Sequence, residues 1–271
     1  LGSIMLAEAG LRVILAVALV TFGFGVAGAT AGFAFSYVAA TVLAIWLLLP
    51  RSLQRGEVHE SLWTTLRDQL RSVPATLSIF GVQAIDVVIA NSRLQDTPME
   101  SFSAAALGGR VIFYAGFVLG LLLLPRFRHI FAGGDLKRSF VLKISAVLAA
   151  ITLIPVVAGF TVPDLVHNAL VGAKYVPDAG LLQRYLIGTA LLTTALFLTY
   201  LIIAAGWNWI AYGLLPIASA QVALYVFVAD TTYDFAWILM AGGAAMCVLL
   251  AITAVILVGR RIRTGQPDQP E

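Results

Sequence analysis

Long apolar blocks, separated by short charged segments, constrain the fold of this chain more than any other feature. Each block is about 20 residues long, which is the length of an α-helix that crosses the hydrocarbon core of a bilayer. The composition agrees, because 11% of the residues are charged, against roughly 25% in a soluble domain. The sequence therefore predicts an all-α, polytopic transmembrane helix bundle with about eight spans, at residues 10–29, 31–50, 74–92, 102–124, 140–159, 180–204, 209–229 and 235–258.

The basic residues collect on alternate connections between these expected spans. Of the 17 Lys and Arg residues, twelve lie on one side, two lie on the other side and three lie within spans. The positive-inside rule then places both the N- and the C-terminus in the cytoplasm. Nucleic acid is not an expected partner, because the basic residues lie beside apolar blocks and form no stripe with aromatic residues.

The connection at residues 51–73 has a helical pattern of its own. Apolar residues recur on one face, at Leu62, Leu66, Leu70 and Val73. This spacing predicts an amphipathic helix at the membrane surface, ended by Pro74, which serves either as a linker between two moving lobes or as a plain anchor. The expected organisation is two helices in 1–50, the cytoplasmic linker 51–73, a six-helix lobe 74–258 and a cytoplasmic tail 259–271.

Two stretches resemble polysaccharide flippases of the multidrug, oligosaccharidyl-lipid and polysaccharide exporter superfamily. The first reads SVPATLSIFGVQAIDVVIANSRL from Ser72 and continues as SFSAAALGGRVIFYAGFVLGLLLLPRF from Ser101. The second, VPDLVHNALVGAKYVPDAGLL at 162–182, is similar to the periplasmic segment of that family. The chain departs from the family at Ser101-Phe102, where the family often has Gly-Tyr, although an aromatic residue is retained.

This resemblance implies a transporter with twelve or fourteen helices in two lobes that rock around a central cleft. The chain would then be partial, lacking about four N-terminal helices, and its residues 1–50 would close the first lobe. The implied function is alternating-access transport of an undecaprenyl-pyrophosphate-linked oligosaccharide across the bacterial inner membrane. Membrane lipids, a polysaccharide polymerase and glycosyltransferases are the implied partners. The alternatives are a cation-coupled multidrug antiporter of the same superfamily and a non-transporting membrane scaffold in polysaccharide assembly.

Charged residues inside the spans are the candidate substrate-binding groups, because burying a charge in a membrane is costly. Asp86 and Arg110 lie at similar depths on adjacent expected spans. Either Arg110 binds the phosphate of the substrate while Asp86 orients it or takes a proton, or the two form a structural salt bridge. Lys143 and Arg184 lie near span ends, where they either snorkel to headgroups or steer a pyrophosphate.

No pattern of catalytic or metal-binding residues accompanies these charges. Paired carboxylates and a nucleophile with a base are missing from the expected spans, so we expect no enzyme. His59, His129 and His167 fall in loops or interfaces without the spacing of metal ligands, and Cys247 is the single cysteine. The sequence therefore predicts neither a metal site nor a cofactor.

Overall fold

The computed structural model describes residues 62–94, 96–132, 138–172 and 178–264, together with a few isolated positions between 14 and 42. The chain divides into two compact units, residues 1–64 and 65–271, and nearly all of the described residues belong to the second unit. The expected spans 10–29 and 31–50, most of the segment 51–61 and the end of the tail lie outside the described residues. The description below therefore concerns the second unit.

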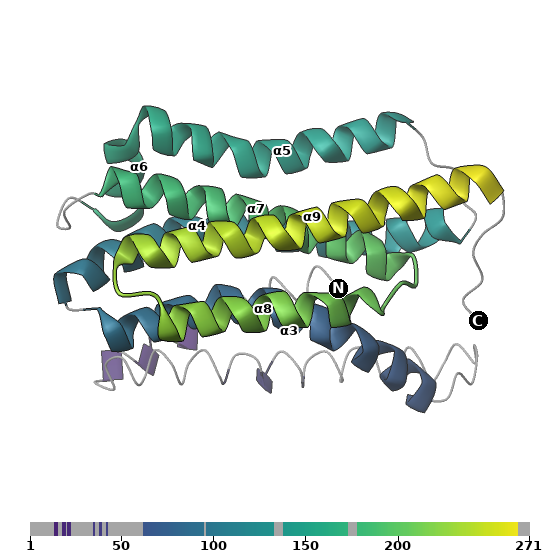
Figure 1. Cartoon of the computed structure of the whole chain (residues 1–271), viewed down its shortest axis with the longest axis horizontal. Coiled ribbons are helices and arrows are strands. Elements are labelled where there is room, and N and C mark those ends of the chain that lie inside the picture. The colour runs from purple at the N-terminus through teal and green to yellow at the C-terminus, as the bar shows by residue number, and fades with distance from the viewer. Residues whose placement is uncertain are drawn as a thin grey trace. The chain divides into compact units, whose positions relative to one another are not determined.

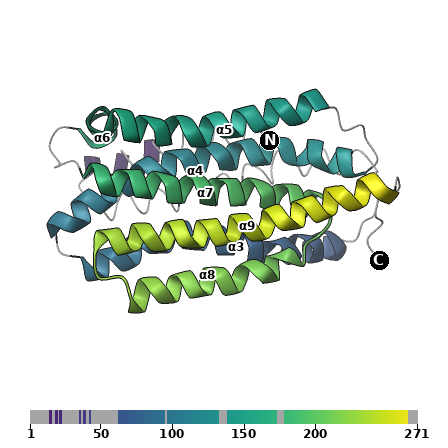
Figure 2. The same ribbon diagram turned by 45° about the horizontal axis from the view of Figure 1, so that its top comes forward.

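Every regular element in the described ranges from residue 62 onward is a helix. They are α3 (Leu62–Arg93), α4 (Asp96–Phe131), α5 (Arg138–Thr161), α6 (Pro163–Val171), α7 (Ala179–Ala204), α8 (Ile210–Phe227) and α9 (Thr232–Thr264). Figures 1 and 2 show the long helices lying side by side in alternating directions, with the short α6 at the end of the bundle where α5 leads into α7. The predicted all-helical class is confirmed for this part of the chain.

Five of these helices contain segments long and apolar enough to cross a membrane. The segments are Val73–Arg93, Pro98–Phe131, Ser139–Thr161, Ala179–Ala204 and Thr232–Leu257, each of which overlaps an expected span. The sixth expected span in this region, 209–229, corresponds to α8, whose apolar part Tyr212–Phe227 is shorter. The protein is therefore a multi-pass helical membrane protein.

The prediction that a helix ends at Pro74 is wrong, because α3 runs through this residue. A proline removes one backbone N–H donor, and membrane helices tolerate that loss where other groups compensate locally. The carbonyl oxygen that loses its donor is that of residue 70, whereas the Ser78 hydroxyl donates to the carbonyl oxygen of Pro74 itself, at 2.7 Å. The surface-helix pattern and the following span thus belong to one continuous helix from Leu62 onward.

The helix α7 lies at the centre of the unit and packs against α4, α5 and α9. Small residues allow the closest of these contacts. A Cβ added at Gly188 of α7 would lie 3.0 Å from the backbone nitrogen of Met240 in α9, and one added at Gly243 would lie 3.0 Å from the carbonyl oxygen of Gly188. Close approach of backbones through small residues is the usual way in which membrane helices gain packing energy.

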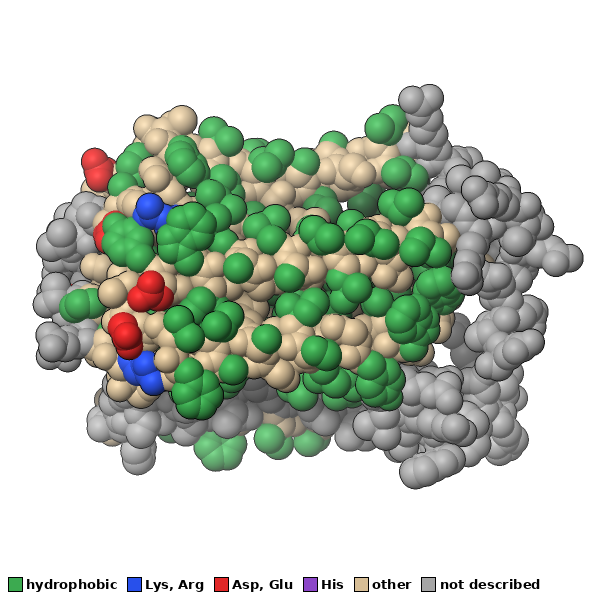
Figure 3. Space-filling view, viewed as in Figure 1, with side chains coloured by type: hydrophobic (Ala, Val, Ile, Leu, Met, Phe, Trp, Pro, Cys, Tyr) green, Lys and Arg blue, Asp and Glu red, His purple; other side chains and the backbone are tan. Residues whose placement is uncertain are grey.

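The two ends of the bundle differ in charge. One end, which we call the acidic end, carries Glu100, Asp164, Asp178, Asp230 and Asp234. The opposite end, which we call the basic end, carries Arg126, Arg128 and His129 in the last turns of α4. Figure 3 shows red and blue side chains gathered at the acidic end, beside a broad face of hydrophobic side chains. This distribution is typical of a protein whose middle lies in hydrocarbon.

Candidate functional site

Asp86 on α3 is the most deeply buried charged residue of the described chain, with no exposed surface. Its carboxylate accepts a hydrogen bond from the hydroxyl of Tyr185 on α7. The backbone N–H of Val87 donates to the other carboxylate oxygen at 2.6 Å. A buried carboxylate needs such donors in place of water, and the bond from Tyr185 connects α3 with the central helix of the bundle.

Four aromatic rings from four helices surround this hydrogen bond. Phe102 of α4 meets the ring of Tyr185 edge-on at 5.5 Å between centroids and lies 5.4 Å from Phe235 of α9. Phe235 stacks on Tyr225 of α8 at 5.3 Å, and Tyr225 in turn interacts electrostatically with Asp86. All four rings are fully buried. We call these five residues the Asp86 cluster. Its apolar walls exclude water and strengthen the interaction of Asp86 with the few polar groups that face it.

Arg110 does not form an ion pair with Asp86 in the described structure, although it acts on that carboxylate electrostatically at longer range. The arrangement of α4 explains why. Gly109 is the residue that faces α7, since a Cβ added there would lie 2.5 Å from the ring of Tyr185. Arg110 is one position further around the helix, about 100° away, and its side chain leaves the Asp86 cluster for the surface.

The side chain of Arg110 lines a cavity of about 420 Å³ at the junction of α3 and α4. We call it the Arg110 pocket. It is bounded by Asn91 of α3 and by the α4 residues Glu100, Ser103, Leu107 and Arg110. A cation, a carboxylate, an amide and a hydroxyl therefore share one open cavity within membrane-spanning helices. Within this set the guanidinium can bind an anionic group, and the carboxylate, amide and hydroxyl can bind hydroxyls.

Arg184 lies at the acidic end and is held by aromatic rings. Its guanidinium carbon is 4.7 Å from the ring centroid of Tyr233 and 5.7 Å from that of Trp237, both on α9. It also donates to the carbonyl oxygen of Gly180 at 3.1 Å. Asp178 caps the start of α7 through the Leu181 N–H and accepts a hydrogen bond from the Tyr233 hydroxyl at 2.8 Å. Arg184 thus contributes to the contact between α7 and α9.

Lys143 is exposed on α5, near the basic end. The helix α5 buries little of its surface, so this lysine lies on a helix that faces outward. Lys143 and Arg184 therefore lie near opposite ends of the bundle, as the directions of α5 and α7 in Figure 1 require. Of the four predicted substrate-binding residues, the structure brings only Asp86 and Arg110 near one another.

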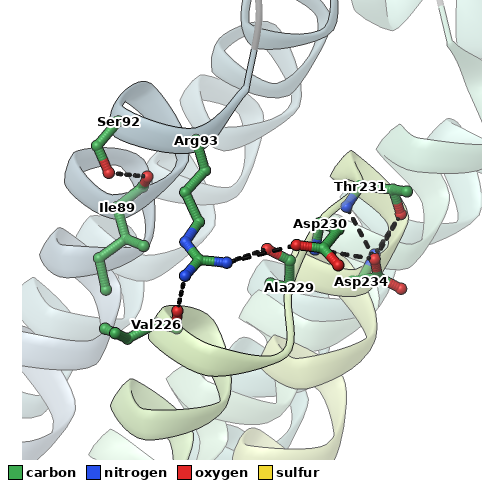
Figure 4. Close-up of polar contacts among 8 residues, drawn as sticks. All are labelled: Ile89, Ser92, Arg93, Val226, Ala229, Asp230, Thr231 and Asp234. Carbon is green, nitrogen blue, oxygen red and sulfur yellow. Dashed lines mark hydrogen bonds and ion pairs between the residues drawn. The ribbon is translucent and has the colours of Figure 1, made fainter.

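A polar contact that the sequence did not predict joins α3 and α8 at the acidic end of the bundle (Figure 4). The guanidinium of Arg93 donates to the carbonyl oxygens of Val226 and Ala229, the latter at 3.3 Å, and it lies 3.4 Å from a carboxylate oxygen of Asp230. Val226 is in the last turn of α8, where backbone carbonyls lack helical partners and the helix dipole is negative. We call this contact the Arg93 clamp.

Other polar residues in the core were also missed by the sequence analysis. Tyr185 donates to Asp86, and the amide nitrogen of Gln221 lies 3.1 Å from the hydroxyl oxygen of Tyr225. Gln83 is buried one helical turn before Asp86. The signal that could have found them is a polar side chain within an otherwise apolar span, the same signal that identified Asp86. Among the described residues, no group of three His, Cys, Asp or Glu side chains could hold a metal ion.

Comparison with models of protein families finds no match for the chain, and comparisons with curated proteins and with solved structures find none either.

Proposed function

We propose that the protein is a transporter that moves a lipid-linked oligosaccharide across a bacterial inner membrane by alternating access. The observation that carries this proposal is the position of Arg110, a permanent cation that lines an open pocket within membrane-spanning helices and has no direct ion pair with Asp86. Ionisable residues inside spans usually line the path of a substrate or an ion. The oligosaccharide and the membrane come from the resemblance of residues 72–127 and 162–182 to polysaccharide flippases.

In this proposal the Arg110 guanidinium binds the diphosphate of an undecaprenyl-type carrier. Its planar fork matches two phosphate oxygens. Asn91, Glu100 and Ser103 offer hydrogen bonds to sugar hydroxyls in the same pocket. Asp86 does not contact the substrate. Its charge attracts Arg110 at longer range and so helps to keep α4 near α3. Lys143 and Arg184 contact headgroups at the two membrane surfaces. The glycosyltransferases act before transport, and the polymerase acts after it.

A second candidate is the cation-coupled multidrug antiporter. The observation that favours it is the burial of Asp86, since a carboxylate inside the membrane can exchange a proton or an alkali cation. The two candidates differ in the charge of the cargo, because a diphosphate would be attracted by Arg110 and an organic cation by Glu100 of the same pocket. A non-transporting scaffold, the third possibility, would need neither charge inside its spans.

The test is the substitution of Arg110 in the full-length protein. Arg110→Lys should reduce export of the lipid-linked oligosaccharide by about tenfold, equivalent to about 1.4 kcal/mol, at an unchanged level of protein in the membrane, because an ammonium group cannot bind two phosphate oxygens in a fork. Arg110→Gln should reduce export further. The measurement is the amount of oligosaccharide that reaches the periplasmic face of the membrane. This face lies inside inverted vesicles and outside right-side-out vesicles.

The matched control is Arg126→Lys, on the same helix but exposed at the basic end, where the guanidinium lies 5.5 Å from the ring centroid of Phe140. This variant should export normally. Normal export by Arg110→Gln would exclude the proposed role of the residue. Extrusion of organic cations by the same vesicles, with no export of oligosaccharide, would favour the antiporter.

A further inference from the structure

Two exposed cations lie close together at the basic end, one on α4 and one on α5. The guanidinium carbon of Arg126, near the end of α4, lies 5.5 Å from the ring centroid of Phe140, at the start of α5. Lys143 comes three residues after Phe140, so the two project from the same face of α5. Side chains on a helix lean toward its N-terminus, which brings the Lys143 ammonium back toward Phe140. Both cations therefore approach one aromatic ring, and we call this pair the Arg126–Lys143 site.

Packing of the helix ends holds this arrangement in place. Phe127, next to Arg126, is buried, and its ring centroid lies 6.5 Å from that of Phe140 and 5.6 Å from that of Phe197 on α7. Arg126 and Arg128 flank Phe127, so they lie about 200° apart around α4. Arg126 is the one that reaches the ring of α5. The site is therefore specific to one side of α4, although several basic residues share this end of the bundle.

The described part of the chain does not neutralise this pair of charges. Arg126 and Lys143 are exposed, and neither has an ion pair within that part. The carboxylates whose side chains are described are the buried Asp86 and those of the acidic end. The positive end of the α5 dipole lies beside the pair, and the first turn of α5 has no acidic residue. An anion between the two cations would therefore be attracted by both and would reduce their mutual repulsion.

The depth of the site corresponds to the lipid headgroups. The membrane-spanning segment of α5 begins at Ser139 and has 23 residues. This length is about 35 Å along a helix, against about 30 Å for the hydrocarbon core. Lys143 lies four residues inside the segment, which is about 6 Å from its start. A lysine at this depth extends its ammonium to the headgroups, where the phosphates of phospholipids are the abundant anions.

Exposed apolar residues follow each cation one helical turn deeper in the membrane. Leu122 lies four residues before Arg126, and Val147 lies four residues after Lys143, so each shares a helix face with its cation. Both are exposed. Because α4 runs toward the basic end and α5 runs away from it, both steps lead into the hydrocarbon. Two cations above two apolar residues match a molecule with an anionic head and acyl chains, whereas a free phosphate would use the cations alone.

We infer that the Arg126–Lys143 site binds an anionic phospholipid, with the headgroup phosphate between the two cations and the acyl chains along Leu122 and Val147. The guanidinium offers paired donors to the phosphate oxygens, and the ammonium adds a compact charge. A phosphatidylglycerol has a net negative charge, whereas the phosphate of a phosphatidylcholine is offset by the cation of its own headgroup. The bound lipid connects α4 with α5 at the basic end. This inference does not depend on the proposed function.

The experiment uses the full-length protein in phosphatidylcholine nanodiscs that contain a small fraction of a phosphatidylglycerol with a photoreactive diazirine near the top of one acyl chain. After irradiation, mass spectrometry measures the label on residues 119–126 of α4 and 140–147 of α5. We expect this probe to label the two segments about tenfold more than a phosphatidylcholine with the same diazirine, equivalent to about 1.4 kcal/mol. Arg126→Gln together with Lys143→Gln should remove most of this preference. Arg126→Lys, which keeps the charge, should retain most of it.

The matched control is Arg128→Gln, which removes an exposed cation from the same end of α4 on the other side of Phe127 and should leave the labelling unchanged. Three outcomes would overturn the inference. The first is equal labelling by the two probes. The second is a loss in Arg128→Gln as large as that in Arg126→Gln, since net charge alone would then attract the lipid. The third is full displacement of the probe by inorganic phosphate, since the site would then take a free anion. The single variants Arg126→Gln and Lys143→Gln give the same comparison if the double variant folds poorly.

Discussion

At the scale of single residues, Asp86 carries the largest energetic constraint in the described chain. An Asp at the centre of a membrane helix costs about 2.5–3.5 kcal/mol in insertion measurements. Here the carboxylate has the Tyr185 hydroxyl and the Val87 N–H as donors, and Arg110 contributes only at longer range. The hydrogen bond from Tyr185 is therefore expected to contribute more to stability than the charge of Arg110.

Tyr185→Phe keeps the ring in the Asp86 cluster and removes the donor. We expect a loss of about 1–3 kcal/mol in the free energy of unfolding, because a buried acceptor is left without its partner. Arg110→Gln should cost less. The measurement is unfolding of the purified protein in detergent. The control is Tyr200→Phe, since the Tyr200 hydroxyl makes no hydrogen bond within the described residues and its ring packs at Gly120. A larger loss for Arg110→Gln than for Tyr185→Phe would mean that a direct ion pair forms in the membrane.

The sequence predicted which charged residues lie inside the spans but not what they face. Depth follows from counting along a helix, so the similar depths of Asp86 and Arg110 were predictable. Direction depends on which helices surround each side chain. The donor to Asp86 comes from a residue 99 positions later, and no local pattern joins the two. Arg110 turns away because Gly109 occupies the contact with α7, which is a property of packing and not of hydropathy.

At the scale of helices, the Arg93 clamp fixes the acidic end of α3 to the C-terminal turn of α8. The amides of Val228 and Ala229 both donate to the carbonyl oxygen of Leu224 in this turn, at 2.9 and 3.1 Å. A guanidinium that binds the neighbouring carbonyls keeps the turn closed and opposes the negative end of the helix dipole. The clamp is thus a local determinant of how tightly α3 and α8 are held together.

Arg93→Gln should increase hydrogen exchange at the amides of Val228 and Ala229 by about tenfold or more. A hydrogen bond to a charged group contributes about 1.5–3 kcal/mol, and its loss favours local opening. The measurement is hydrogen–deuterium exchange with mass spectrometry in detergent. Arg128→Gln, at the exposed basic end of α4, serves as the control and should not change exchange at this turn. Equal protection in wild type and Arg93→Gln would show that the turn is held by its backbone alone.

The existence of the long helices was predictable, whereas their exact ends and the short helix α6 were not. Apolar length identifies a span because lipid leaves the backbone no other partner. Pro74 was expected to end a helix, but the loss of one donor was tolerated and α3 continued. Between α7 and α8, Gly206 takes a positive φ of 84°. The turn at Gly206 is followed by an α8 whose apolar part is shorter than the expected span.

At the scale of the whole molecule, the second unit has an acidic and a basic end, and its orientation in the membrane stays a prediction from the basic residues. The positive-inside rule places the basic end in the cytoplasm. The acidic end, with α6 and the start of α7, would then face the periplasm. This assignment also places the Arg110 pocket nearer the outer surface, because Asn91 and Glu100 belong to the acidic end of α3 and α4.

A cysteine at Asn168 should react with an impermeant maleimide added to intact cells, and a cysteine at Ala132 should react only after the membrane is opened. Both residues are exposed, Asn168 on α6 and Ala132 directly after α4. The single native cysteine, Cys247, is replaced by serine in both variants. Each variant is its partner's control for expression and reactivity, and the reverse labelling pattern would invert the orientation.

The hydrogen bond between Asp86 and Tyr185 also has a consequence for biogenesis. Chains enter the membrane in the order of their synthesis, and Tyr185 is made 99 residues after Asp86. The helix α3 is therefore inserted while its carboxylate has no donor from α7, and α4 and α5 follow before that donor arrives. A nascent chain that stops after α5 holds the Asp86 carboxylate with the Val87 N–H as a donor but without the Tyr185 hydroxyl. The polar contact between α3 and α7 can therefore be completed only after α7 has entered the membrane.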